Sequence, residues 1–194
     1  DIQLGQRLVS AGALVSRPPQ IGLLAAAGHS RVLVVQRPRV AIIATGDEII
    51  APGQALGKGK IYASNLLTLS TWCSLHGFSS DVWVVKDEPE AIRARLLEAV
   101  PAHDAILTSG GAWQGDRDLV VRLLDQLGWQ KVYHWVRMGP GKAVGFGLWH
   151  GKPVFCLPGG PPSNQMAFIQ LALPGLQKLA GYRRPGLPLV KAKL

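Results

Sequence analysis

The sequence predicts an α/β fold: a three-layer sandwich with a mostly parallel sheet, plus a small N-terminal mixed segment. Three observations lead to this prediction. Runs such as "RVAIIAT" (39–45) are continuously apolar, which is typical of strands buried on both faces. Segments with helical spacing of apolar residues alternate with these runs. Glycines and prolines mark the changes between them, and 194 residues suffice for one domain with a core.

The elements expected between residues 39 and 180 follow from these patterns. Strands are expected at 39–45, 81–86, 104–108, 131–137, 143–149 and 153–158, and helices at 64–76, 88–100, 116–127 and 162–180. The first of these helices has Ser64 or Asn65 as its expected cap and Gly77 as its stop. The third presents one apolar stripe and ends at Gly128. Such repeated strand–helix–strand units bind ligands beyond the carboxyl ends of their strands.

The pattern divides the chain into three parts. Residues 1–37 are expected to be an appendage that belongs to a linking domain, with a helix at 19–26, a stop at Gly28 and a strand at 31–36. Residues 38–182 form the α/β domain. Residues 183–194 are interpreted as the start of a truncated C-terminal β domain.

The net charge of +9 favours an anionic partner. The basic residues are scattered, and no basic helix stripe or RNA-binding motif is present, so the sequence predicts a small anionic ligand rather than nucleic acid. A plainly solvated surface is the alternative interpretation. Two cysteines without metal-type spacing indicate a reducing, cytoplasmic setting, and no apolar run is long enough to predict a membrane span.

Four glycine-rich loops follow predicted strands and should open on one edge of the sheet. They are "TGDE" (45–48), "TSGGAWQGDRD" (108–118), "MGPGKAVGFG" (138–147) and "LPGGPPSN" (157–164). Glycines allow close backbone approach to a ligand, and helix starts favour anions. The convergence of these loops distinguishes a site from ordinary turns.

The polar residues of the loops admit two interpretations each. Asp47, Glu48 and Asp116 could bind Mg²⁺ through carboxylate oxygens, or they could serve as turn and helix-cap residues. Lys142 leaves a stiff loop and could contact a phosphate or oxyanion, or it could be a solvated lysine. Ser163 and Asn164 are expected both to cap the last helix and to bind ligand. Together these residues indicate a metal-assisted phosphate or pterin site.

The five motifs that include these loops resemble those of the molybdopterin molybdotransferase family, of the MoeA and gephyrin E-domain type. The family pattern reads approximately "RPRVAIISTGDEL", "G.I.DSN", "TSGGVSVGDYD", "KPGKP..FG" and "LPGNPVS". This sequence has "RPRVAIIATGDEI", "GKIYASN", "TSGGAWQGDRD", "MGPGKAVGFG" and "CLPGGPPSN", in the same order and with similar spacing. The resemblance covers nearly the whole chain, and it implies a fold shared with molybdopterin adenylyltransferases, a parallel-sheet α/β sandwich.

The resemblance implies an activity: Mg²⁺-dependent insertion of molybdate into adenylylated molybdopterin, with release of AMP. It implies that Asp47, Asp116 and Asp118 bind the cation or position the pyrophosphate, and that Lys142 contacts phosphate or molybdate. It further implies a pterin and nucleotide pocket lined by Thr45, Gly46, Asn65, Ser109, Gly110, Gly111, Gly115, Pro140, Gly141, Pro158, Gly159, Gly160 and Ser163. A homodimer and contacts with other molybdenum cofactor enzymes are the partners that it implies.

Several positions depart from the family pattern. Ala112, Trp113 and Gln114 replace the serine-containing loop, Ala143 replaces the second proline of "PGKP", and Gly160 replaces the asparagine of "PGNP". The acidic residues and Lys142 are retained, which favours a divergent active enzyme. The alternatives are an adenylyltransferase on the same fold and a non-catalytic molybdopterin-binding or carrier module.

Overall fold

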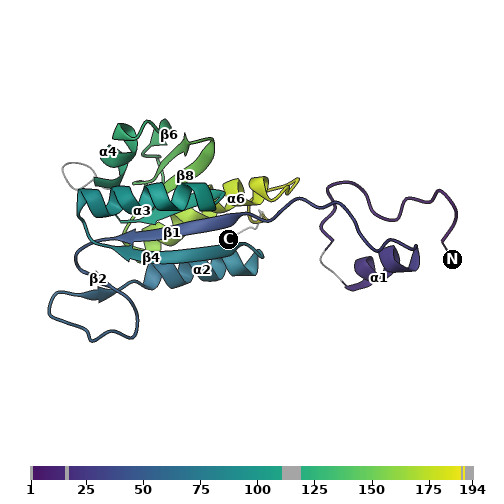
Figure 1. Cartoon of the computed structure of the whole chain (residues 1–194), viewed down its shortest axis with the longest axis horizontal. Coiled ribbons are helices and arrows are strands. Elements are labelled where there is room, and N and C mark those ends of the chain that lie inside the picture. Colours follow the sequence, from purple (N-terminus) through teal and green to yellow (C-terminus); the bar gives the residue numbers. More distant parts are fainter. Residues whose placement is uncertain (1, 16–17, 111–118, 189, 191–194) are drawn as a thin grey trace.

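The computed structural model describes residues 2–15, 18–110, 119–188 and 190, and its centre is a six-stranded sheet (Figure 1). The strand order is β4-β1-β5-β8-β7-β6. The strands are β1 (Arg39–Thr45), β4 (Ser79–Val85), β5 (Ala105–Ser109), β6 (Gln130–His134), β7 (Gly145–Trp149) and β8 (Lys152–Leu157). Strands β4, β1, β5 and β8 are parallel, whereas β7 and β6 are antiparallel to their neighbours. The predicted α/β fold with a mostly parallel sheet is confirmed.

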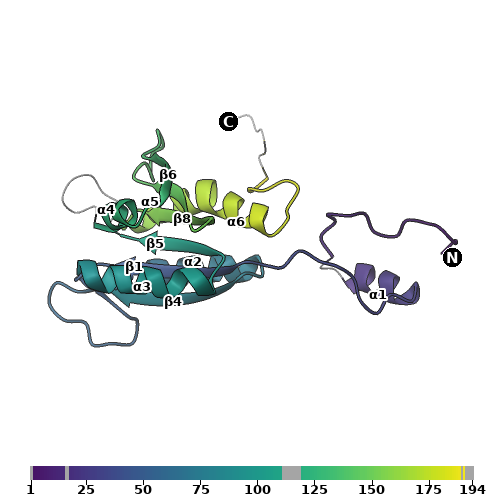
Figure 2. The same cartoon turned by 45° about the horizontal axis from the view of Figure 1, so that its top comes forward.

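Helices cover both faces of this sheet (Figure 2). On one face lie α2 (Ser64–Leu75), α5 (Pro161–Ala167), a π-helical segment (Phe168–Ala172) and α6 (Leu173–Leu179). On the other face lie α3 (Pro89–Ala102) and α4 (Leu119–Gln126). Two separate apolar cores result, one on each side of the sheet.

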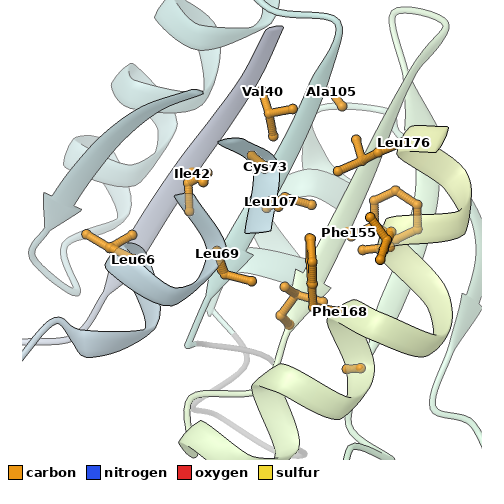
Figure 3. Close-up of a cluster of buried hydrophobic side chains, with 14 of the residues drawn as sticks. Val40, Ile42, Leu66, Leu69, Cys73, Ala105, Leu107, Phe155, Phe168 and Leu176 are labelled. Carbon is orange, nitrogen blue, oxygen red and sulfur yellow. The ribbon is translucent and has the colours of Figure 1, made fainter. Parts of the chain in front are cut away.

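The continuous apolar run of β1 supplies both cores in alternation. Val40 and Ile42 point toward α2 and α6, as Figure 3 shows, whereas Ala41 and Ile43 pack under α3. Leu107 of β5 joins the first core in the same way. Successive side chains of a strand point to opposite faces, so a strand covered on both sides needs apolar residues at every position.

Two short strands were absent from the sequence prediction. β2 (Ile49–Ile50) pairs in parallel with β3 (Ile61–Tyr62), and the loop between them projects beyond the carboxyl end of β1 (Figure 1). Runs of two residues carry no periodicity, so sequence patterning cannot detect them.

The strand expected at 31–36 is wrong. Residues 31–37 have no regular secondary structure, and Leu33 and Val34 are exposed. Figure 1 shows this segment leaving the sheet toward α1 (Pro18–Ala26). The β-branched composition favours an extended backbone, but a strand also needs a neighbour to pair with. The proposed boundaries at residues 37 and 182 stay predictions.

Two expected helix caps are also wrong. α2 has Ala63 as its N-cap and α5 has Gly160, and neither helix start receives a side-chain cap. The side chains of Asn65 and Asn164 are used elsewhere, as described below. The long helix expected over 162–180 is present from Pro161 but is interrupted by the π-helical segment.

The antiparallel edge of the sheet is irregular. β6 ends at His134, before the expected Arg137, and its register with β7 shifts between Lys131 and Tyr133. Across the residues that the structure describes, no helix has the length and apolar character needed to cross a membrane.

Candidate functional site

A cleft of about 930 Å³ lies at the carboxyl ends of the parallel strands. The loops after β1, β4, β5 and β8 reach it, and β2 and β3 form one wall. Its lining includes Thr45, Asp47, Glu48, Tyr62, Ser64, Asn65, Asp87, Ser109, Gly110, Pro158, Gly159, Gly160 and Ser163. Parallel strands bring their carboxyl ends to one edge, which explains why residues so distant in sequence meet here.

The floor of the cleft is organised by two asparagines and one serine. Asn65 Nδ2 lies 2.8 Å from the carbonyl oxygen of Gly159 and 3.0 Å from Ser109 Oγ. Asn164 Nδ2 lies 2.8 Å from the carbonyl oxygen of Pro158 and 3.1 Å from the same Ser109 Oγ. These bonds connect α2, α5 and the ends of β5 and β8.

This network fixes the hydrogen-bonding role of Ser109. A carbonyl oxygen can only accept, so the amide groups of Asn65 and Asn164 must present nitrogen to it. Both nitrogens also donate to Ser109 Oγ, which uses the two lone pairs of the hydroxyl. The proton of Ser109 is then left to donate to an acceptor, and Ser109 lines the cleft. The site therefore offers a hydroxyl donor to a ligand oxygen.

Gly110 brings two strand ends into close contact. Its φ is +98°, and a Cβ built on it would lie 2.5 Å from the carbonyl oxygen of Thr45 and 3.2 Å from Thr45 Oγ1. Only glycine fits such an approach without displacement of the backbone. Thr45 Oγ1 is itself buried and has no hydrogen-bond partner in the part of the chain that the structure describes.

Three carboxylates form an acidic rim, which we define as Asp47, Glu48 and Asp87. The backbone N–H of Asp87 donates to Asp47 Oδ1 over 3.2 Å. Partial desolvation of the Asp87 carboxylate, and then the negative charges of Glu48 and Asp47, raise the pKa of Asp87 above its ordinary value, although the residue remains exposed. Lys60 brings a positive charge to this rim, since its Nζ donates to the carbonyl oxygen of Asp47 over 2.6 Å.

The acidic rim does not by itself make a metal centre. Among the described residues, no group of three or more His, Cys, Asp or Glu side chains could hold a metal ion. Asp47 and Glu48, which are two of the three predicted Mg²⁺ ligands, line the cleft. The third, Asp116, lies outside the described residues, as do Gly111, Gly115 and Asp118.

The predicted loop at 138–147 contributes differently from the other three. Only Ala143 of this loop lines the cleft, whereas Pro140, Gly141 and Lys142 do not. Gly141 packs closely against α5. A Cβ built on Gly141 would lie 3.1 Å from the carbonyl oxygen of Ser163. Lys142 is exposed, and its Nζ lies 5.6 Å from the centroid of the Trp135 ring. Gly46 also lies outside the lining.

Sequence reasoning missed Asp87 and Tyr62 as lining residues. Asp87 was detectable in principle, because it follows the end of β4 as Asp47 follows the end of β1. Tyr62 sits on the undetected strand β3. Asn164, which sequence reasoning placed at a cap, is buried beneath the cleft instead.

Replacement of Asp87 by asparagine should stabilise the protein at neutral pH. A raised folded-state pKa means that the charged carboxylate is disfavoured in the folded protein, so its stabilising contribution is present in acid and lost as the pH rises. Asp87→Asn should therefore raise the free energy of unfolding at pH 7 by less than about 1 kcal/mol, because the exposed residue is screened by water.

The measurement is thermal unfolding from pH 3 to pH 8. The gain should disappear as the pH falls through 3.8, the ordinary Asp value. Glu90→Gln, which removes an exposed charge from the first turn of α3, serves as the control and should not stabilise. A lower melting temperature for Asp87→Asn than for the parent protein at pH 7 would show that the charged Asp87 carboxylate is not disfavoured in the folded protein.

Comparison with known proteins shows what this chain resembles. A family model described as "Probable molybdopterin binding domain" matches residues 41–178. The molybdopterin molybdenumtransferase of Nostoc sp. is 32% identical over 191 residues, which is 96% of this chain and 44% of that protein. The molybdenum cofactor synthesis protein cinnamon of Drosophila melanogaster is 34% identical over 163 residues, or 84% of this chain and 27% of that protein.

Solved structures agree with the sequence relatives. The molybdopterin biosynthesis MoeA protein from Pyrococcus horikosii superposes with a TM-score of 0.80 at 35% identity, over 90% of this chain and 43% of that one. The chain spans less than half the length of these relatives. The family match covers most of the chain, including β1, α2, the acidic rim and the Ser109 network. This chain therefore belongs to the family of molybdopterin-binding domains that the sequence motifs indicated.

Proposed function

We propose that the chain acts in molybdenum cofactor biosynthesis, in the Mg²⁺-dependent insertion of molybdate into adenylylated molybdopterin with release of AMP. Family membership supports a molybdopterin-type ligand. Relatives named molybdopterin molybdenumtransferase support the reaction. The homodimer and the contacts with other molybdenum cofactor enzymes that the resemblance implies are part of the same proposal.

The observation that carries the proposal is the directed proton of Ser109. Its hydroxyl accepts from Asn65 and Asn164 and can only donate to a further partner. A phosphate or molybdate oxygen is an acceptor of that kind. The start of α2, formed by Ala63, Ser64 and Asn65, lines the same cleft without a side-chain cap, and uncapped helix amides favour an anion.

The proposed reaction balances without any oxidant or reductant. Water attacks the phosphoanhydride, one P–O bond breaks, and AMP and the molybdopterin phosphate leave while the released proton goes to solvent. The two thiols of molybdopterin then displace one oxide of molybdate, which leaves as water with the two thiol protons. Molybdenum remains Mo(VI). The role of this chain is to bind and orient the anionic groups, since Ser109 offers a proton to an oxygen without transferring it.

The metal dependence rests on the carboxylates. Asp47 and Glu48 line the cleft and carry the oxygen ligands that Mg²⁺ prefers, and Asp116 would complete the set that the motifs imply.

The test is AMP release from adenylylated molybdopterin, measured with and without molybdate and Mg²⁺. Asp47→Asn and Asp116→Asn should each reduce release at least tenfold, an effect typical of a lost charge contact in an active site. Glu98→Gln, an exposed residue of α3, is the control and should release AMP like the parent.

Other outcomes separate the alternatives. Formation of adenylylated molybdopterin from ATP and molybdopterin, with no molybdate-dependent AMP release, would replace the proposal with the adenylyltransferase. Tight binding of the substrate without AMP release under any condition would leave a carrier module.

A further inference from the structure

One aromatic side chain lines the cleft among the residues that the structure describes, and this is Tyr62 of β3. We propose that Tyr62 is the stacking platform for a heteroaromatic ring of the ligand. This inference rests on the proposed function, because it assigns a place to the pterin or adenine ring of the same substrate.

The backbone fixes the position of Tyr62. Its neighbours on both sides are hydrogen-bonded to the segment after β1: Ile61 N donates to the carbonyl oxygen of Glu48 over 2.8 Å, and Ala63 N donates to that of Ile50 over 2.9 Å. α2 begins directly after Ala63 and packs on the sheet. Tyr62 is therefore anchored to rigid structure on both sides, although it lies at the end of a long loop.

The side chain of Tyr62 is also oriented before any ligand binds. Its hydroxyl donates to the carbonyl oxygen of Gln54 over 3.0 Å, and the side chain of Gln54 accepts from the backbone N–H of Ala51 over 3.3 Å. The polar end of the ring is thus turned to its own loop. The residue is 41% exposed, so it keeps free surface for a partner. A ring held in place loses little conformational entropy on binding.

The surroundings of Tyr62 fit a ring that carries N–H donors. Ile49 and Ile61 add apolar surface to the same wall, and Glu48 of the acidic rim is bonded through its carbonyl oxygen to Ile61, the neighbour of Tyr62. Pterin and adenine both combine a flat π face with amino donors at the edge. Stacking satisfies the face, and carboxylates satisfy the donors.

The interpretation to exclude is that Tyr62 only stabilises the loop through its hydroxyl. Two substitutions separate these roles. Tyr62→Phe keeps the ring and removes the bond to Gln54, whereas Tyr62→Leu removes the aromatic face. A platform predicts that the first variant binds ring ligands like the parent and the second does not. If Tyr62 only stabilises the loop through its hydroxyl, both variants should show equal defects in ligand binding.

The experiment measures the affinity of the whole chain for AMP, for pterin-6-carboxylate and for ribose 5-phosphate, which carries a phosphate but no base. Tyr62→Leu should weaken AMP, the pterin or both roughly tenfold, the scale of one lost base–aromatic stack, and leave ribose 5-phosphate unchanged. The two ring probes show which ring Tyr62 receives. Tyr182→Leu is the matched control, because this tyrosine packs near His76 after α6 and does not line the cleft.

Four results would overturn the platform: no binding of either ring probe to the parent chain, undiminished ring binding by Tyr62→Leu, equal ring-binding defects in Tyr62→Leu and Tyr62→Phe, or an equal loss for ribose 5-phosphate. Circular dichroism of each variant shows whether it is folded. The readout is independent of turnover. Ring-dependent binding without AMP release from adenylylated molybdopterin would refute the enzyme and keep the platform.

Discussion

A Gly110→Ala variant is expected to lose about 2 to 4 kcal/mol of unfolding free energy and to lose ligand binding at the cleft. The left-handed backbone, with φ of +98°, costs an L-residue about 1 to 2 kcal/mol. The new Cβ would also lie 2.5 Å from the carbonyl oxygen of Thr45, which is backbone and cannot rotate away. The end of β1 must therefore separate from the end of β5, and the two loops that flank the cleft move apart.

Two control variants divide this effect into its parts. Gly128→Ala has a similar φ of +78° but open space around its Cβ, so it should show the conformational cost alone. Gly159→Ala has an ordinary backbone conformation and a 3.6 Å contact with the Cα of Gly110, so it should be tolerated. Urea unfolding gives the three free energies. Equal losses for Gly110→Ala and Gly128→Ala would show that the contact with Thr45 is easily relieved.

A Phe168→Ala variant is expected to lose about 3 to 5 kcal/mol of unfolding free energy. Phe168 is fully buried in the core beneath α2, where its ring lies 6.3 Å from that of Trp72 (Figure 3). It belongs to the π-helical segment between α5 and α6, so its loss leaves a cavity at the centre of that helical layer. The removed ring is too large for its neighbours to fill the space by small shifts.

The measurement for Phe168→Ala is the urea midpoint together with the slope of the transition. A lower midpoint with an unchanged slope indicates lost stability without a change in the unfolded state. Leu179→Ala, at the exposed end of α6, removes apolar atoms without creating a cavity and should cost under about 1 kcal/mol. A loss of similar size in both variants would mean that the layer repacks around the missing ring.

The sequence allowed the main sheet to be predicted because its strands obey one strong constraint. Residues 39–45 and 104–108 lie between two helical layers, so nearly every position must be apolar and the pattern is continuous. The same reasoning failed for residues 31–36. Their composition is equally β-favouring, but no strand lies beside them in the described part of the chain, and pairing is a property of the fold.

The candidate site was predictable where its residues are placed by the ends of strands. It was not predictable where the partner of a side chain is chosen by the folded structure. Asp47, Ser109 and Gly159 line the cleft because each lies at or just beyond the carboxyl end of a parallel strand. Asparagine is a residue type that often caps helices, yet the side-chain amide of Asn164 is buried and donates to Pro158 and Ser109. Lys142 faces Trp135, a contact that requires a turn of the chain at residues 135–142 and has no signature in sequence spacing.

The irregular edge strand β6 has a consequence for behaviour at high concentration. An uncovered strand with regular spacing offers its N–H and C=O groups as a template on which other chains can aggregate. The register shift between Lys131 and Tyr133 breaks that spacing, and Lys131 adds a charge that is held by Asp125 over 2.8 Å. A strand from another chain that approaches this edge meets misaligned hydrogen-bonding groups. Pairing there would also bury the charged ammonium group of Lys131, which costs free energy. The bulge thus acts as a safeguard against fibril growth at the antiparallel end of the sheet.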